Sequence, residues 1–184
     1  MFIQTESTPN PETLKFLPGR TVLADDTRDY RSPESAAESP LASAIFSIRG
    51  VTGVFFGYDF VTVTKSDAEW QHLKPAILGA IMEHFVAGTP LFVGEQTSVD
   101  EDEFFETEDS ETVATIKELL ETRVRPAVAN DGGDITFKGY RDGVVYLTMK
   151  GACSGCPSST ATLRHGIQNL LKHFLPDVQE VRAA

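Results

Sequence analysis

The chain is short of cysteine, of long apolar runs and of positive charge, and each shortage excludes a class of protein. Only two cysteines occur in 184 residues, which is too few for the disulfide framework of a small secreted domain. No apolar run approaches the about 18 residues that a membrane-spanning helix needs. The formal net charge of −11 argues against nucleic acid or an anionic membrane as a partner, because both are negatively charged themselves.

The first residues, MFIQTESTPNPETLKF, also lack the features of a targeting segment. They contain no basic n-region and no apolar h-region, so we expect no secretory signal. They are acidic and free of arginine, unlike an Arg-rich transit peptide. We therefore expect a soluble protein in a reducing compartment, the cytoplasm. There, closely spaced cysteines bind metal or react more often than they form a structural disulfide.

The negative charge is concentrated in one segment, which predicts two domains joined by a linker. Residues 89–110 carry eight acidic and no basic side chains, whereas residues 111–184 carry nine basic and eight acidic ones. The run GEQTSVDEDEFFETEDSE shows no helical or strand period, and like charges keep such a segment extended. We expect a first domain at residues 1–93, an acidic flexible linker at 94–110 and a second domain at 111–184.

Two aromatic residues in this linker, Phe104 and Phe105, leave an alternative open. Set among acids, they could dock on a basic partner. A plain solvated linker is the simpler interpretation, because runs of like charge usually only keep a linker extended.

The first segment has the pattern of a small α+β domain. A Pro-Asn-Pro turn signal separates two short strands at FIQTES and TLKFLP, and apolar residues at helical spacing predict a long helix over Trp70–Val86. The remaining expectations are a loop over residues 25–40, a short helix from Pro40, a hairpin around Gly57–Asp59 and a last strand at Pro90–Val93.

The second segment predicts the order helix, strand, strand, cysteine loop, helix, strand. An amphipathic helix containing Ile116 comes first, and Pro126 should kink or end its regular part. Asp142-Gly143 joins the runs ITFKGY and VVYLTM as a tight hairpin. A second amphipathic helix follows the cysteines, and an edge strand is expected at Val178–Val181. The fold class is therefore α+β, with two small mixed domains joined by the acidic linker.

Both cysteines, Cys153 and Cys156, lie in the run KGACSGCPSST between the second strand and the last helix. Pro157 fits the first position of that helix, where its missing N–H costs nothing. A thiolate at a helix N-terminus is stabilised by the helix dipole, so Cys156 should readily bind metal or attack a disulfide. Gly151 and Gly155 allow backbone amides to approach the sulfur atoms.

Several kinds of site compete for these two thiolates. Two cysteines that merely pack would not need C-x-x-C spacing in a glycine-rich loop. A thioredoxin-type oxidoreductase uses such a pair at a helix start, but on a βαβ pattern, whereas a hairpin precedes this one. A structural zinc ion normally takes four ligands, and His165 and His173 fit no zinc template, so we interpret them as solvated helix residues.

An iron–sulfur cluster meets the same shortage of ligands, because it usually takes four thiolates. One chain supplies two, but two chains related by a two-fold axis supply four, each presenting its C-x-x-C pair in the same way. A cluster held between subunits could leave when the subunits part.

Two stretches of the sequence resemble a known family. The run VRPAVANDGGDITFKGYRDGVVYLTMKGACSGCPSSTATLRHGIQNLL resembles the C-terminal domain of NifU, found in Nfu-type iron–sulfur carriers, and FIQTESTPNPETLKFLPG resembles the amino-terminal domain of the same proteins. G-A-C-S-G-C-P-S-S downstream of D-G-G-D is the specific part of this resemblance. Within it, we interpret Asp131–Asp134 as a structural turn rather than a set of ligands.

The resemblance implies a carrier rather than an enzyme. It implies that Cys153 and Cys156 hold a [4Fe–4S] cluster, less readily a [2Fe–2S] cluster, within a homodimer. An upstream scaffold would supply the cluster and apo iron–sulfur proteins would receive it. The chain lacks the cysteine-rich scaffold domain of long NifU proteins, so delivery is expected rather than assembly with a desulfurase. The N-terminal domain would recognise partners or modulate delivery. The alternative functions are a C-x-x-C thiol–disulfide oxidoreductase and, less favoured, an interaction module with an incidental zinc site.

Overall fold

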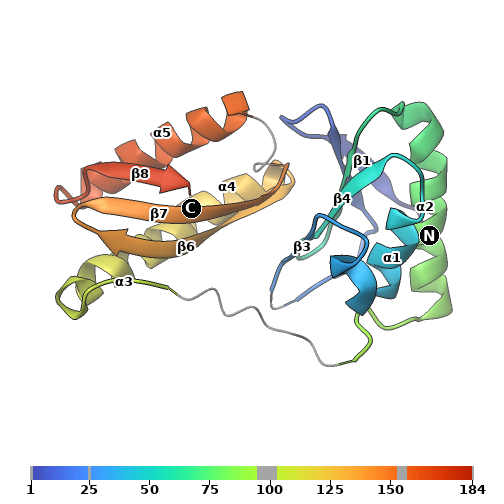
Figure 1. The fold of residues 1–184 in the computed structure, drawn as a ribbon, viewed down its shortest axis with the longest axis horizontal. Helices are drawn as coiled ribbons and strands as arrows, with labels where there is room; N and C mark the ends of the chain where they lie inside the picture. The colour runs from blue at the N-terminus through green and yellow to red at the C-terminus, as the bar shows by residue number, and fades with distance from the viewer. Residues whose placement is uncertain (1, 25, 95–102, 153–156, 184) are drawn as a thin grey trace. The chain divides into compact units, whose positions relative to one another are not determined.

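The computed structural model divides the chain into two compact units, Met1–Ser98 and Val99–Ala184 (Figure 1). It describes residues 2–24, 26–94, 103–152 and 157–183. Each unit has its own sheet and its own apolar core. No helix in these described ranges is long and apolar enough to cross a membrane.

The first unit is a five-stranded antiparallel sheet with two helices packed on it (Figure 1). The strand order is β1-β2-β5-β4-β3. The elements in chain order are β1 Gln4–Ser7, β2 Thr13–Leu17, β3 Arg28–Tyr30, a 3₁₀ turn η1 Ser35–Glu38, α1 Pro40–Phe46, β4 Val51–Phe56, β5 Val61–Lys65 and α2 Trp70–Ala87. The expected hairpins and both expected helices are confirmed.

Local chemistry explains where these elements begin. The Asn10 side chain accepts a hydrogen bond from the backbone N–H of Glu12 (3.0 Å), which closes the turn between β1 and β2. Ser39 caps α1 by accepting from the N–H of Ala42 (3.3 Å), and Pro40 takes the first helical position. Such a cap contributes about 1 kcal/mol to a helix.

Two expectations for the first unit are wrong, and tertiary contacts explain both. Residues 28–30 form β3 inside the stretch expected to be a loop, because Tyr30 is buried and its hydroxyl donates to Glu38 (2.6 Å). Residues 90–93 form no strand. Leu91 and Phe92 pack on the core instead, and the N–H of Val93 donates to the carbonyl of Glu38 (2.7 Å).

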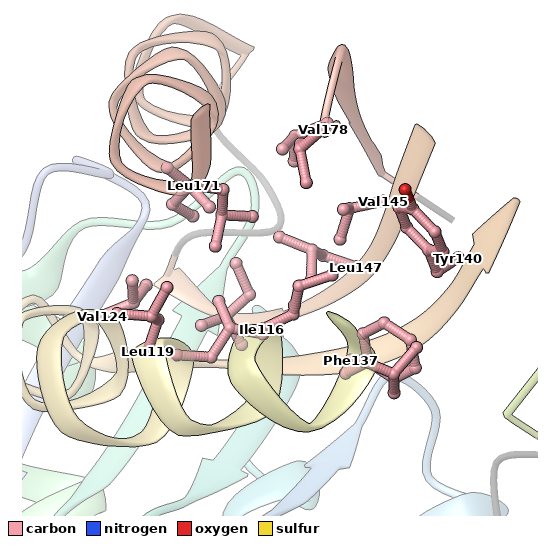
Figure 2. Close-up of a cluster of buried hydrophobic side chains, with 14 of the residues drawn as sticks. Ile116, Leu119, Val124, Phe137, Tyr140, Val145, Leu147, Leu171 and Val178 are labelled. Atoms are coloured by element: carbon pink, nitrogen blue, oxygen red, sulfur yellow. The ribbon is translucent and has the colours of Figure 1, made fainter. Parts of the chain in front are cut away.

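The second unit is a three-stranded mixed sheet of order β6-β7-β8, in which β6 and β7 are antiparallel and β7 and β8 parallel. Its elements are a 3₁₀ turn η2 Thr107–Asp109, α3 Ser110–Leu119, a π-helical turn η3 Leu120–Val124, α4 Arg125–Asn130, β6 Gly133–Arg141, β7 Val144–Gly151, α5 Pro157–Phe174 and β8 Glu180–Ala183. This is the predicted order. Apolar side chains of the helices meet those of the sheet in one core (Figure 2).

The β6–β7 hairpin forms as expected. Asp142 and Gly143 both have positive φ, 51° and 78°. A two-residue hairpin loop of type I′ requires positive φ at both of its residues. The carbonyl of Gly143 accepts from the N–H of Gln179 (2.7 Å), just before β8 begins. The turn therefore also fixes the start of the last strand.

The C-terminal end of the expected linker is ordered against the second unit. The N–H of Phe104 donates to the carbonyl of Lys138 (3.1 Å), and the carbonyl of Phe104 accepts from the N–H of Tyr140 (2.9 Å). The Phe104 ring lies over Gly139 and 5.2 Å from the ring of Tyr146. Phe104 thus docks on the second unit, although it lies within the stretch 94–110 that was expected to be a linker.

Candidate functional site

The two candidate ligands, Cys153 and Cys156, lie outside the described residues, but the structure describes both ends of their loop. Strand β7 ends at Gly151 and helix α5 begins at Pro157. The loop therefore joins the end of a strand to the start of a helix, and Pro157 occupies the predicted first helical position. The N-terminal end of this 18-residue helix carries the positive end of the helix dipole.

The base of the cysteine loop is held by the D-G-G-D turn. Gly133 pairs with Gly151 across the β6–β7 ladder. One residue further on, the N–H of the buried Ala152 donates to the carbonyl of Gly132 (3.2 Å). Gly132 itself has φ of +83°, which reverses the chain between α4 and β6. The turn therefore has a structural role: it supports the residue that precedes Cys153.

The last residue of this turn, Asp134, forms an ion pair with the partly exposed Arg125. Asp134 is only 4% exposed and receives two hydrogen bonds from Arg125: Nε to Oδ1 at 2.9 Å and Nη2 to Oδ2 at 3.0 Å. The Nη1 of Arg125 also donates to Glu121 (2.6 Å). The hydrogen bond with Asp134 is the main cause that raises the pKa of the Arg125 guanidinium. Asp134 pairs with Lys150 across the ladder, so the ion pair holds β6 at the point where its partner strand β7 leads into the loop.

A π-helical turn brings Arg125 to this position. As expected, the regular part of this helix ends before Pro126: α3 ends at Leu119, the chain widens into η3, and it then continues as α4 to Asn130. Proline cannot donate to the carbonyl one turn earlier, and a π turn relieves the resulting clash without ending the helix. Sequence reasoning missed Arg125 and Asp134. The sequence did contain one signal for this ion pair: Asp134 is a charged residue in a strand whose other residues are mostly apolar or buried.

The two histidines of α5 lie where they were expected. His165 and His173 are exposed on the outer side of the helix. Among the residues that the structure describes, no three His, Cys, Asp or Glu side chains are grouped to hold a metal ion.

Two family descriptions match the chain. Residues 3–88 match "Scaffold protein Nfu/NifU N terminal", and residues 116–182 match "NifU-like domain". The matched ranges fall within the first and the second structural unit, respectively.

Curated relatives match almost the whole chain. NifU-like protein 4, mitochondrial, of Arabidopsis thaliana is 54% identical over 184 residues, which cover 98% of this chain and 65% of that protein. The human NFU1 iron-sulfur cluster scaffold homolog, mitochondrial, is 51% identical over 183 residues, covering 98% of this chain and 71% of that protein. The chain thus spans about two thirds of the length of these relatives.

A solved structure is also similar in part. The solution NMR structure of a NifU-like protein from Saccharomyces cerevisiae is 27% identical, with a TM-score of 0.47, over 52% of this chain and 87% of that one.

These relatives correct one expectation. The first residues of the chain led us to expect a cytoplasmic protein. That expectation is contradicted, because the Arabidopsis and human relatives are named as mitochondrial proteins. With about half of all residues identical to these relatives over nearly its full length, the chain belongs to the Nfu/NifU-like family of iron–sulfur cluster scaffold proteins.

Proposed function

We propose that this protein carries a [4Fe–4S] cluster on Cys153 and Cys156, bridged between two chains, and delivers it to apo iron–sulfur proteins. The observation that carries the proposal is the position of the C-x-x-C pair: one short loop between β7 and α5, in a family named for iron–sulfur scaffolds. The cluster is cargo here, received from an upstream scaffold and passed on.

The bridged arrangement follows from counting ligands. A cubane cluster usually takes four thiolates, and the whole chain contains two cysteines. Two copies related by a two-fold axis provide four in equivalent positions. A [2Fe–2S] cluster would be served by the same four thiolates and is the less favoured cargo.

The same arrangement favours release. Each chain contributes its ligands from one loop, so the fold need not open to free them. Thiolates of a recipient could replace the carrier's sulfur atoms one at a time, as in thiol exchange. Because the chain has a net charge of −11, it should be repelled by nucleic acid and by anionic membranes, and we do not expect either as a partner.

Substitution of the cysteines tests the binding site. Cys153→Ser and Cys156→Ser should each fold, because the described core does not include the loop, yet hold little cluster after anaerobic reconstitution. Iron and sulfide per chain, Mössbauer spectra and mass by light scattering are the measurements. About four irons on a strictly monomeric protein would contradict the bridged site.

Transfer distinguishes a carrier from the alternative, a thiol–disulfide oxidoreductase. Holo-protein should activate an apo [4Fe–4S] enzyme faster than equivalent free iron and sulfide, also when a chelator captures released iron. Loss of activation with the chelator would mean that the cluster falls apart in solution. Reduction of insulin disulfides by the apo-protein at a rate near that of thioredoxin would instead favour the oxidoreductase, whose reactive thiolate also sits at a helix start.

A further inference from the structure

The chain that enters the cysteine loop is held by the turn between α4 and β6. Gly151 is the last residue of β7, and it pairs with Gly133 at the start of β6. The next residue, Ala152, is only 1% exposed, and its N–H donates to the carbonyl of Gly132 (3.2 Å). The entry of the cysteine loop therefore rests on two neighbouring residues of this turn.

Helix α4 holds the turn at both of its ends. At the first end, the N–H of Gly132 donates to the carbonyl of Ala129 (3.0 Å), in the last turn of α4. At the second end, Asp134 accepts two hydrogen bonds from Arg125, the residue with which α4 begins. A shift of either contact would move the backbone that supports the loop entry.

The contact of Arg125 with Asp134 is directional. Nε and Nη2 of Arg125 reach the two carboxylate oxygens at 2.9 and 3.0 Å, and such a bidentate pair fixes the orientation of the carboxylate as well as its distance. Oδ1 of Asp134 also accepts from the backbone N–H of Ile135 (2.8 Å), which ties the carboxylate to the backbone of β6. A lysine at position 125 would present a point charge and could not impose this orientation.

The apolar core of the second unit does not include this pair. Its buried members come from α3, the sheet and α5, among them Ile116, Leu147 and Leu171. The Arg125 side chain is 34% exposed. A substitution that keeps a positive charge at position 125 should therefore leave the core intact and act on the turn.

We propose that Arg125 is a positioning residue for cluster binding. Through Asp134 it holds the turn that supports Ala152, and this determines how long a bound cluster is retained. The inference rests on the proposed function, because it concerns a cluster held by Cys153 and Cys156. Removal of groups that orient metal ligands commonly lowers metal affinity about 10–100-fold, and Arg125 acts from further away, so we expect an effect of about fivefold.

The first test uses the apo-protein and needs no cluster. Amide hydrogen exchange at Ala152, followed by NMR, reports how often the loop entry opens locally. Arg125→Lys keeps the charge but loses the two parallel hydrogen bonds, and it should speed this exchange about tenfold. Glu121→Gln is the matched control: it removes the other carboxylate contact of Arg125 and should leave the exchange at Ala152 unchanged.

The second test measures retention of the cluster. After anaerobic reconstitution, Arg125→Lys should hold as much iron and sulfide per chain as the wild-type protein, because both keep the two cysteines. The variant should then lose its cluster to an iron chelator about fivefold faster. The iron–sulfur stretching bands in its resonance Raman spectrum should broaden, because the thiolates are held in a wider range of positions.

A third variant separates positioning from general stability. Val181 is 1% exposed and pairs with Val145, at the end of β7 that lies away from the cysteine loop. Val181→Ala should lower the melting temperature of the second unit at least as much as Arg125→Lys does. It should nevertheless leave both the exchange at Ala152 and the lifetime of the cluster unchanged.

Three outcomes would overturn the proposal. The first is unchanged exchange at Ala152 in Arg125→Lys. The second is an unchanged cluster lifetime in that variant. The third is an equal effect of Val181→Ala, which would make stability the cause. A wild-type chain that holds no cluster, or holds one without its cysteines, would instead refute the proposed function itself, and the link from Arg125 to cluster retention with it.

Discussion

At the residue scale, Asp134 joins the helix before it to the strands that lead into the cysteine loop. Its carboxylate is almost fully buried. Its two oxygen atoms accept two parallel hydrogen bonds, one from Nε and one from Nη2 of Arg125. Its Oδ1 also accepts from the N–H of Ile135 (2.8 Å). Removing one member of a buried ion pair leaves the other uncompensated, and this costs more than the pair itself contributes.

Substitution of Asp134 by Asn should therefore destabilise the second unit strongly. We expect a loss of about 2–3 kcal/mol in the free energy of unfolding, below the full value for a buried pair because Arg125 is partly exposed. Urea denaturation of the apo-protein measures it. Glu121→Gln removes only the exposed contact of Arg125 and should cost less than about 1 kcal/mol. Equal losses for the two variants would contradict this account.

The buried imidazole of His84 predicts a pH dependence of the first unit. Burial lowers its pKa in the folded state below the ordinary value of 6.5, so the unfolded chain binds the proton more readily. Stability is therefore fully present above pH 6.5 and is lost as the pH falls through the lower, folded pKa. Thermal unfolding followed between pH 7.5 and 5 should show this fall. His84→Gln should flatten it, and an unchanged slope would rule the imidazole out as its cause.

At the scale of elements, a short segment covers part of the open edge of β6. Strand β6 is an edge strand, and unpaired edges invite association. Phe104 bridges to Gly139 in parallel register, and Arg141 lies over the Phe104 ring at 5.5 Å. Glu103 pairs with Lys117 on α3. The segment from Glu103 to Phe105 thus covers the open edge of β6 at Gly139, the position where β6 has no side chain of its own.

A double-mutant cycle should show that Phe104 and Gly139 fit each other. A Cβ at Gly139 would lie 2.4 Å from the Phe104 ring, so Gly139→Ala should expel the ring and expose Glu103 and Glu106 to a Glu-specific protease. Phe104→Ala should have a similar effect. The double variant should lose little more than either single one, because the two share one interaction. Strictly additive losses in unfolding free energy would mean that the two residues act independently.

Periodicity predicted the regular elements because their side chains alternate between core and solvent. The long helix α2, the hairpins β1–β2 and β6–β7, and the order of the second unit follow from such patterns and from turn residues. The errors lie where a distant contact decides the local structure. Strand β3 depends on Tyr30 and Glu38, and the segment after α2 folds onto the core rather than adding a strand.

Only part of the candidate site and its surroundings shows in the sequence, for the same reason. Cys153 and Cys156 stand out because their spacing and their neighbours are visible along the sequence. Arg125 and Asp134 are nine residues apart, and Pro126 signals an irregular helix at Arg125 without showing which side chain Arg125 will meet. The hydrogen bond between Ala152 and Gly132 likewise joins segments that only the folded sheet brings together.

At the scale of the whole molecule, the chain consists of two units with separate cores. Phe16, Ile45 and Ile77 belong to one core, and Ile116 and Leu147 to the other. Each unit matches its own family description. Between them lies the most acidic part of the sequence, with no basic side chain in residues 89–110. Each unit should therefore unfold on its own.

Limited proteolysis should cut the chain between the two units, before the segment that Phe104 holds on β6. Like charges and the lack of an apolar period predict that a Glu-specific protease cuts first after Glu95 or Glu101. Glu106 and Glu108 are expected to be cut later, because they follow the segment held on β6. The two fragments, separated by size, should each show one cooperative thermal transition that matches a transition of the intact chain. First cuts within residues 2–94 or 103–183 would contradict this prediction, and fragments that lose cooperative unfolding would show that the two units depend on each other for stability.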